Sequence, residues 1–231
     1  PQDSNGIRLW ETFGNYAWAW IHKHPDGDAW TTEKRYPLRP RVMWKHWRDA
    51  ETLIGVRFGK QTAYAMLDID KGSDYLNETS VRDIFGALET IGITRPVVLR
   101  SSWSGGLHIY CPLPEPVGTF DLAVALKGTL EAQGFKVAEG QLECFPNTKT
   151  FGKHWLKQFV EYQGHRLPLQ PGSGSTLLAS YNLQPIGGDL ERFWSHWDFA
   201  AQAVDMEMLR CAIAAGKANR RKHKRVWSKL H

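Results

Sequence analysis

The 231-residue sequence has few cysteines and no long hydrophobic run, and both absences limit the class of protein. Its three cysteines, Cys111, Cys144 and Cys211, are far apart and form no C-x-x-C pair, which argues against a disulfide framework and a zinc ribbon. No apolar run reaches the roughly 20 residues of a membrane helix, and the first residues lack a signal-peptide pattern. We therefore expect a soluble, cytoplasmic protein.

Repeats, low-complexity tracts and a P-loop Gly-Lys-Ser/Thr motif are also missing, so solenoid folds and P-loop NTPases are not indicated. What the chain does have is enough apolar material for a core, with 42% hydrophobic residues and 11 Trp. Because it begins with Pro and ends in a basic, helix-like stretch, we expect it to be part of a longer protein.

The net charge of +5 is concentrated in two stretches. Residues 217–231 hold seven Lys/Arg and no acid, and without them the chain has 22 basic and 24 acidic residues. Residues 34–60 hold eight Lys/Arg against two acids, interleaved with Tyr36, Trp44, Trp47 and Phe58. Cations that contact phosphates beside rings that stack on bases are typical of single-strand nucleic-acid binding, although an ordinary solvated surface has the same composition.

From residue 63 onward the pattern predicts an α+β fold. Strands are expected at 63–70, 96–101, 106–113 and 141–145, and helices at 78–92 and 120–134, each ended by a glycine. This β-α-β-β-α-β order is that of ferredoxin-like folds. One or two further helices are expected near the C-terminus.

In such a sheet the first and third strands are central and the fourth lies beside the first. Asp68 and Asp70 end the first strand, His108 begins the third, and Glu143 begins the fourth. Because side chains alternate along a strand, all four are expected on the face away from the helices, and we expect that face to be open. The arrangement predicts one cluster at one edge of the sheet.

Asp68, Asp70 and Glu143 would offer hard oxygen ligands to Mg²⁺ or Mn²⁺. Two such ions about 4 Å apart can assist phosphoryl chemistry. A solvated strand end explains an isolated D-x-D equally well, but not the third acid. Asp74 fits the turn that follows the strand better than the metal cluster.

The turn "RSSWSGGLH" (100–108) precedes His108 and is rich in small residues. Ser102, Ser104 and the two glycines allow a phosphate chain to approach the backbone closely, with hydroxyls and His108 as donors. An ordinary hairpin turn has the same composition.

Together, "AMLDID", "SWSGGLHIY" and "LECFP" resemble the three motifs of the archaeo-eukaryotic primase superfamily, the primase-polymerases, over residues 50–180. Many members have Asp in the third motif, and Glu143 followed by "CFP" is more similar to versions from mobile elements and plasmid replication proteins. The resemblance implies a primase fold with an RRM-like or ferredoxin-like catalytic core. It implies metal binding by Asp68, Asp70 and Glu143, and nucleotide binding by Ser104 and His108, with Ser102 beside them.

A member of this family also needs cations for the triphosphate. Arg166 is the first candidate and Lys153 the next, followed by Lys157, although each is equally explained as a surface charge. The expected partners are a single-stranded DNA template, a primer and NTP or dNTP, and a helicase or other domain in the full-length protein.

We expect an N-terminal lobe at 1–60 that contacts nucleic acid, a catalytic core at 61–185 and C-terminal helices at 186–231. The resulting hypothesis is a primase-polymerase that performs two-metal nucleotidyl transfer. The alternatives are a catalytically silent nucleic-acid-binding module and a replication-initiator nuclease, for which His22 and His24 have the spacing of a metal-binding pair. Nucleotide cyclases also place paired carboxylates on such a sheet.

Overall fold

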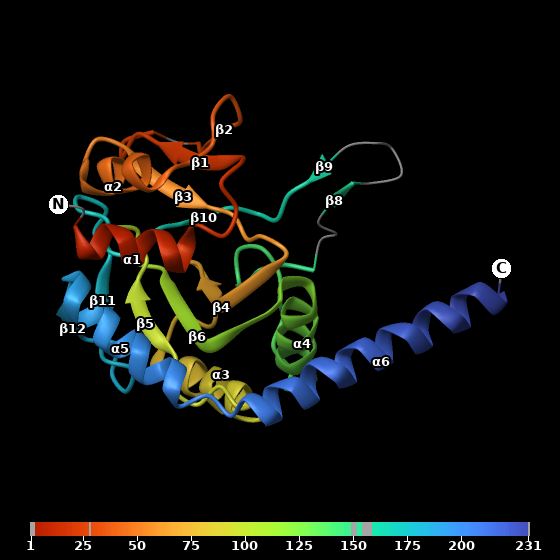
Figure 1. The fold of residues 1–231 in the computed structure, drawn as a ribbon. Helices are drawn as coiled ribbons and strands as arrows, with labels where there is room; N and C mark the ends of the chain where they lie inside the picture. Colours follow the sequence, from red (N-terminus) through yellow and green to blue (C-terminus); the bar gives the residue numbers. More distant parts are fainter. Residues whose placement is uncertain (1–2, 28, 149–151, 154–158, 231) are drawn as a thin grey trace.

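The computed structural model describes residues 3–27, 29–148, 152–153 and 159–230. At 152–153, 159–160 and 222–230 it describes the backbone only. Two larger sheets and six helices form the body, and the α+β class predicted from the sequence is confirmed (Figure 1). The six-stranded sheet has the order β12-β11-β5-β6-β4-β7.

The β-α-β-β-α-β unit predicted from the sequence is present in this sheet. Its strands pair antiparallel, with the first and third strands central and the fourth beside the first. Its elements are β4 (Gln61–Ile69), α3 (Glu78–Glu89), β5 (Val97–Arg100), β6 (Leu107–Gly118), α4 (Thr119–Ala132) and β7 (Leu142–Phe145).

Helices α3 and α4 end at the two glycines that the sequence indicated. Gly92 and Gly134 have φ values of 87° and 89°, a conformation that a side chain would strain. In each case the residue after the glycine donates its N–H to a carbonyl in the last turn of the helix, and Ile93 and Phe135 do so at 3.1 Å. Both helices then cover the sheet face that carries Leu67, which is buried with them.

The opposite face is not open, and that prediction is wrong. Tyr64, Met66 and Tyr110 point to this side and are buried at 1% exposure or less, in one aromatic cluster with Phe13 and Trp197. Helix α1 (Ser4–Phe13) and helix α5 (Leu190–Gln202) supply the covering side chains. Aromatic burial of this kind removes much apolar surface from water and therefore closes the face, except at the end of β4.

The N-terminal residues form a smaller sheet of order β10-β3-β1-β2. Strand β10 comes from much later in the chain and pairs with β3, so the expected boundary at residue 60 separates segments that share a sheet. The division at residues 60 and 185 itself stays a prediction. The elements of this part are β1 (Trp20–Lys23), β2 (Thr31–Glu33), α2 (Pro40–Arg48), β3 (Leu53–Val56) and β10 (His165–Arg166).

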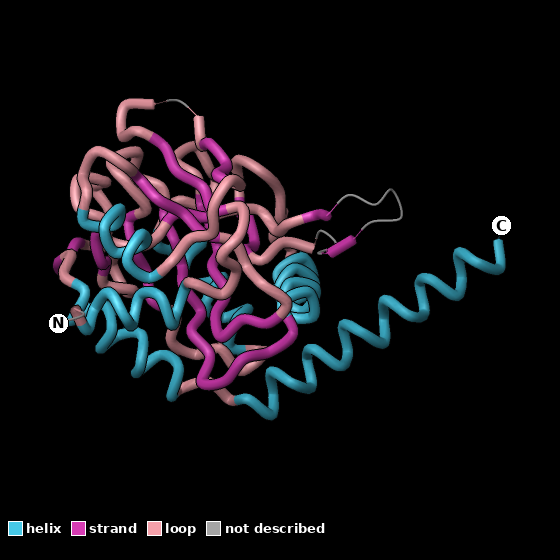
Figure 2. Tube along the Cα trace, turned by 45° about the horizontal axis from the view of Figure 1, so that its top comes forward, coloured by secondary structure: helices cyan, strands magenta, loops and turns pink. Residues whose placement is uncertain are grey.

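The C-terminal part extends the large sheet and then leaves it. Strands β11 (Thr176–Leu178) and β12 (Pro185–Gly187) continue the sheet beyond β5. Two helices follow, as expected. Helix α6 (Met206–Leu230) packs on α4 at its start and then projects away from the body (Figures 1 and 2).

A short pair, β8 (Gly152–Lys153) with β9 (Phe159–Val160), completes the described strands. Among the described helices, none combines the length and apolar character of a membrane-spanning segment. The three cysteines have free thiols, with Cys111 and Cys144 buried and Cys211 exposed.

Candidate active site

Asp68 is the centre of the candidate site, because it has a polar neighbour on each adjoining strand. In the register of the sheet it lies directly opposite His108 on β6 and directly opposite Glu143 on β7. Residues opposite each other in an antiparallel pair have Cβ atoms about 4.5 to 5.5 Å apart. The three sequence segments predicted to meet at one edge of the sheet therefore do meet.

Asp70 belongs to the same cluster, just past the end of β4. It is half-buried, and its negative charge helps to raise the pKa of Asp68. Its carbonyl accepts the N–H of Ser73, which starts the turn after the strand. Asp74 is exposed in that turn, as expected.

Burial and, after it, the charges of Asp70 and Glu143 raise the pKa of Asp68, while Arg166 acts in the opposite direction, and the resulting pKa is about 7. Three carboxylates in a partly buried site repel one another. Asp68 in the free protein therefore binds a proton more tightly than an aspartate side chain in water does. A cation between the carboxylates would remove that repulsion.

His108 does not supply the compensating charge. Its Nε2 lies 3.7 Å from Asp68 Oδ1, which is beyond hydrogen-bonding distance. Burial and the nearby Arg166 hold the pKa of His108 well below its ordinary value, so the imidazole is neutral at pH 7. A neutral His108 can donate a hydrogen bond to a ligand without carrying charge into the site.

The glycine-rich turn lies against the end of β4. A Cβ at Gly106 would be 2.8 Å from the carbonyl oxygen of Ile69, so only glycine allows this approach. The hydroxyls of Ser102 and Ser104 are 2.7 Å apart and hydrogen-bonded, with Ser102 buried and Ser104 exposed. The turn that approaches the end of β4 therefore also carries two hydroxyls.

Arg166 reaches the site from β10 of the smaller sheet. Its guanidinium donates to the carbonyl of Ser101 at 3.3 Å and lies 5.6 Å from the ring centre of Trp30. Burial lowers its pKa from the ordinary value, while Asp68 and Tyr110 act to raise it. Arginine remains protonated after such a shift, so the site contains a positive charge close to the acids.

His165, which precedes Arg166 in the chain, forms a buried polar pair with Tyr64 of β4. Tyr64 Oη and His165 Nε2 are 2.9 Å apart, and His165 Nδ1 has no hydrogen-bond partner among the described residues. Sequence reasoning missed this pair and Trp30. Trp30 is one of several Trp in the N-terminal part, and its sequence context gave no sign that it would pack on a cation 136 positions away.

Other predicted residues are placed less completely. Lys153 lies in β8, but its side chain is outside the described part of the chain, and Lys157 lies outside it altogether. A cavity of about 240 Å³ opens beside Glu143 and is also lined by Lys127, Glu139 and Gln163.

The described side chains contain no group of three or more His, Cys, Asp or Glu that could by itself hold a metal ion. Mg²⁺ sites commonly use only one or two carboxylates and complete the shell with water and substrate phosphates. The hard oxygens of Asp68 and Asp70, and the repulsion that raises the pKa of Asp68, fit such an ion.

Comparison with known proteins gives distant structural similarity. No family model matches the sequence, and no curated protein matches it. The polymerase domain of Mycobacterium tuberculosis ligase D, in complex with DNA, is 15% identical with a TM-score of 0.40, over 86% of this chain and 84% of that domain. The primase-polymerase domain of cyanophage S-2L is 15% identical with a TM-score of 0.39, over 80% of this chain and 95% of that domain.

Proposed function

We propose that the chain catalyses metal-assisted nucleotidyl transfer on a single-stranded DNA template, as a primase-polymerase. The observation that carries this proposal is the position of Asp68 between His108 and Glu143 in the sheet register. In support, the charge of Arg166 acts on Asp68, and the turn that carries Ser102 and Ser104 approaches the end of β4 at Gly106. Carboxylates for a divalent cation, with hydrogen-bond donors and a cation for phosphate oxygens, suit the binding of a nucleoside triphosphate together with a metal.

In the proposed reaction the 3′-hydroxyl of a primer, or of the first nucleotide, loses its proton to solvent as its oxygen forms a bond to the α-phosphorus of an incoming nucleotide. The bond from that phosphorus to the bridging oxygen breaks, and pyrophosphate leaves with the electron pair. Bound Mg²⁺ or Mn²⁺ would supply charge stabilisation at the attacked phosphate and activation of the attacking oxygen.

The residues of the chain have separate roles in this proposal. Asp68 and Asp70 hold the cation, and Glu143 completes the acidic side of the site. His108 and the hydroxyls of Ser102 and Ser104 donate hydrogen bonds to the triphosphate. Arg166 contacts phosphate oxygens with its planar guanidinium, and Lys153 stays a further candidate for that contact.

Gel analysis of labelled nucleotide incorporation tests the proposal. The protein is incubated with single-stranded DNA, with or without a primer, in Mg²⁺, Mn²⁺ or EDTA. We expect template-dependent products only with a metal. Retention of the template without incorporation under any condition would favour the silent binding module, and a cyclic product from nucleotide alone would favour a cyclase.

A replication-initiator nuclease makes a different prediction. Such an enzyme would leave a 5′-phosphotyrosyl adduct on the protein after incubation with a single DNA strand. We expect no adduct, since the histidine pair it requires would have to come from His22 and His24, and neither residue is among the groups that meet at Asp68.

A further inference from the structure

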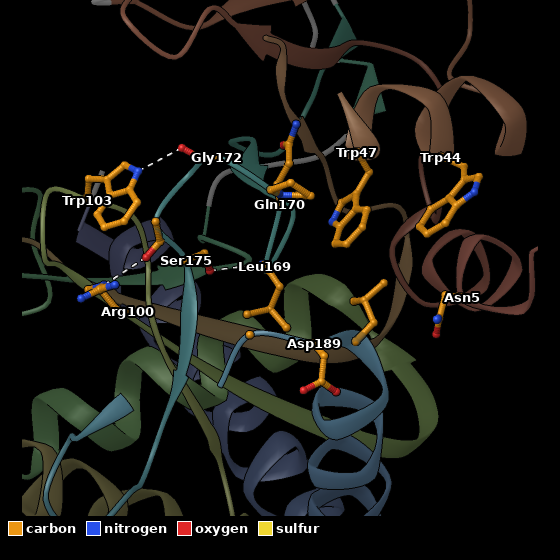
Figure 3. Close-up of a pocket in the computed structure, with 14 residues that line it drawn as sticks. Asn5, Trp44, Trp47, Arg100, Trp103, Leu169, Gln170, Gly172, Ser175 and Asp189 are labelled. Carbon is orange, nitrogen blue, oxygen red and sulfur yellow. Dashed lines mark hydrogen bonds between the residues drawn. The ribbon is translucent and has the colours of Figure 1, made fainter. Parts of the chain in front are cut away.

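A second cavity, of about 560 Å³, is lined by Arg100 and Trp103 of the glycine-rich turn and is called here the Trp103 pocket (Figure 3). Its walls come from the turn, from the loop 169–175, from α2 and from the start of α5. Its lining residues include Trp103, Trp44, Trp47, Arg100, Gln170 and Asp189.

Trp103 forms one wall and is exposed yet held in place. The residue is 75% exposed, although its Nε1 donates to the Gly172 carbonyl at 3.0 Å and its backbone N–H donates to the Ser173 carbonyl at 3.0 Å. The guanidinium of Arg100 lies 5.5 Å from the ring centre. A Cβ at Gly174 would come within 2.4 Å of the indole, so the loop closes tightly on it. An exposed ring that is already ordered loses little entropy when a flat ligand stacks on it.

Trp44 and Trp47 form the opposite wall. Their rings are stacked, with centres 5.2 Å apart and planes 8° from parallel, and Trp47 Nε1 donates to the Pro168 carbonyl at 2.9 Å. Figure 3 shows this pair and Trp103 on two sides of the pocket, with Gln170 between them. The pocket thus presents indole surface from two sides.

Polar groups in the pocket are engaged within the protein. Gln170 accepts the Ile54 N–H and donates to three backbone carbonyls, those of His46, Asp49 and Thr52. The Asp189 side chain accepts the Arg192 N–H at the start of α5. The wall holds one acid, Asp189, and one cation, Arg100, whose Nε donates to the Gly174 carbonyl at 3.0 Å. Because these charges balance and the indoles offer flat apolar surface, a flat, uncharged base suits the pocket better than a phosphate.

The positive charge needed for a phosphate backbone lies just outside. Helix α2, which carries Trp44 and Trp47, also exposes Arg41, Lys45 and Arg48 to solvent. The surrounding stretch 34–60 has eight basic and two acidic residues. Cations beside stacking rings are the arrangement that single-strand binding proteins use.

We propose that the Trp103 pocket binds an unpaired base of a single nucleic-acid strand. The position of Trp103 between Ser102 and Ser104 links this pocket to the candidate active site through one turn. The identification of the bound strand as the template rests on the proposed function. The binding of a single strand in this pocket is independent of that function.

Fluorescence anisotropy with a fluorescein-labelled oligothymidylate tests the proposal, in EDTA and without nucleotide. We expect Trp103→Ala to weaken binding about 5- to 160-fold, because stacking on one aromatic ring contributes about 1 to 3 kcal/mol per base. Trp103→Phe should restore most of the affinity. Tyr181→Ala is the matched control, since Tyr181 is 77% exposed, and should bind as the wild type does.

Unchanged affinity in Trp103→Ala would overturn the proposal, and so would equally tight binding of thymidine monophosphate alone. A measurement on the wild-type chain removes any concern about folding. An oligonucleotide carrying 5-iododeoxyuridine should crosslink to Trp103, Trp44 or Trp47 on irradiation, and crosslinks found only elsewhere would contradict the pocket. Strand binding and nucleotide incorporation are also measured in Asp68→Asn. We expect this variant to bind the strand as the wild type does and to lose incorporation, so that a failure of the pocket and a failure of the proposed function give different results.

Discussion

Asp68 on β4 and Glu143 on β7 lie directly opposite each other in the large sheet, although 75 residues separate them in the chain. The charge of Glu143 contributes to the pKa of about 7 that Asp68 has in the folded protein. Negative charges facing each other across a strand pair destabilise a sheet. The protein therefore carries an electrostatic cost at a position that a bound cation would relieve.

Divalent cations should stabilise the folded protein. At a Mg²⁺ concentration ten times the dissociation constant, the gain is about 1.4 kcal/mol, or a Tm increase of about 3 to 6 °C for a chain of this size. Asp68→Asn and Asp70→Asn should lose this increase, while Asp74→Asn, a change in the exposed turn, should keep it. Thermal unfolding with and without Mg²⁺ measures the difference, and an equal increase in all variants would contradict metal binding by Asp68 and Asp70.

Trp30 should act as a positioning residue for Arg166. Its ring covers the guanidinium at 5.6 Å, and contacts of this kind contribute about 0.5 to 2 kcal/mol. We expect Trp30→Ala to weaken nucleotide binding about 2- to 30-fold, with partial recovery in Trp30→Phe. Isothermal titration with a non-hydrolysable nucleotide measures this effect.

Trp18→Ala is the control for that experiment, because Trp18 is 54% exposed in the same part of the chain. A loss of affinity in Trp18→Ala equal to that in Trp30→Ala would indicate a general effect on the N-terminal part. Unchanged affinity in Trp30→Ala would remove Trp30 from the site.

His165 should make the fold sensitive to acid. Burial lowers its pKa from the ordinary 6.5 to about 3, so the folded protein keeps it neutral while the unfolded chain takes up a proton. Stability from this group is complete above pH 6.5 and is lost as the pH falls toward 3, by up to about 1.4 kcal/mol per pH unit.

His165→Gln tests this relationship, because the side-chain amide can hydrogen-bond to Tyr64 Oη as donor or acceptor but does not titrate. Urea unfolding between pH 7 and 4.5 should show a smaller loss of stability in this variant than in the wild type. His196→Gln, at an exposed histidine, should follow the wild type. An unchanged pH dependence in His165→Gln would show that another group controls acid unfolding.

The sequence predicted the parts of the fold that depend on local periodicity. Alternation in "MLDID" separated Leu67 from Asp68 correctly, and the glycines at 92 and 134 marked the helix ends. The antiparallel order of four strands then placed Asp68, His108 and Glu143 side by side. Each step required only the pattern of one segment and the geometry of a known unit.

Contacts between distant segments were not predictable in this way. Helices α1 and α5 pack on the face of the large sheet that carries Tyr64 and Tyr110, and this packing depends on the shape of the whole core. The pattern of β4 and β6 alone therefore suggested that this face is open. The pairing of β10 with β3, which brings Arg166 toward Asp68, has no local signal. The exposure of Trp103, in contrast, did have a local signal in the sequence. An indole in a turn of serines and glycines has no local apolar neighbour to pack on.

The most direct test of the account is extension of a labelled primer on single-stranded DNA in Mg²⁺ or Mn²⁺, comparing Asp68→Asn with Asp74→Asn. Both changes remove one carboxylate and are separated by six residues, but only Asp68 lies opposite Glu143. We predict loss of extension by at least about 100-fold in Asp68→Asn, because a catalytic metal contributes several kcal/mol, and wild-type extension in Asp74→Asn. Extension by Asp68→Asn at the wild-type rate would contradict the central claim.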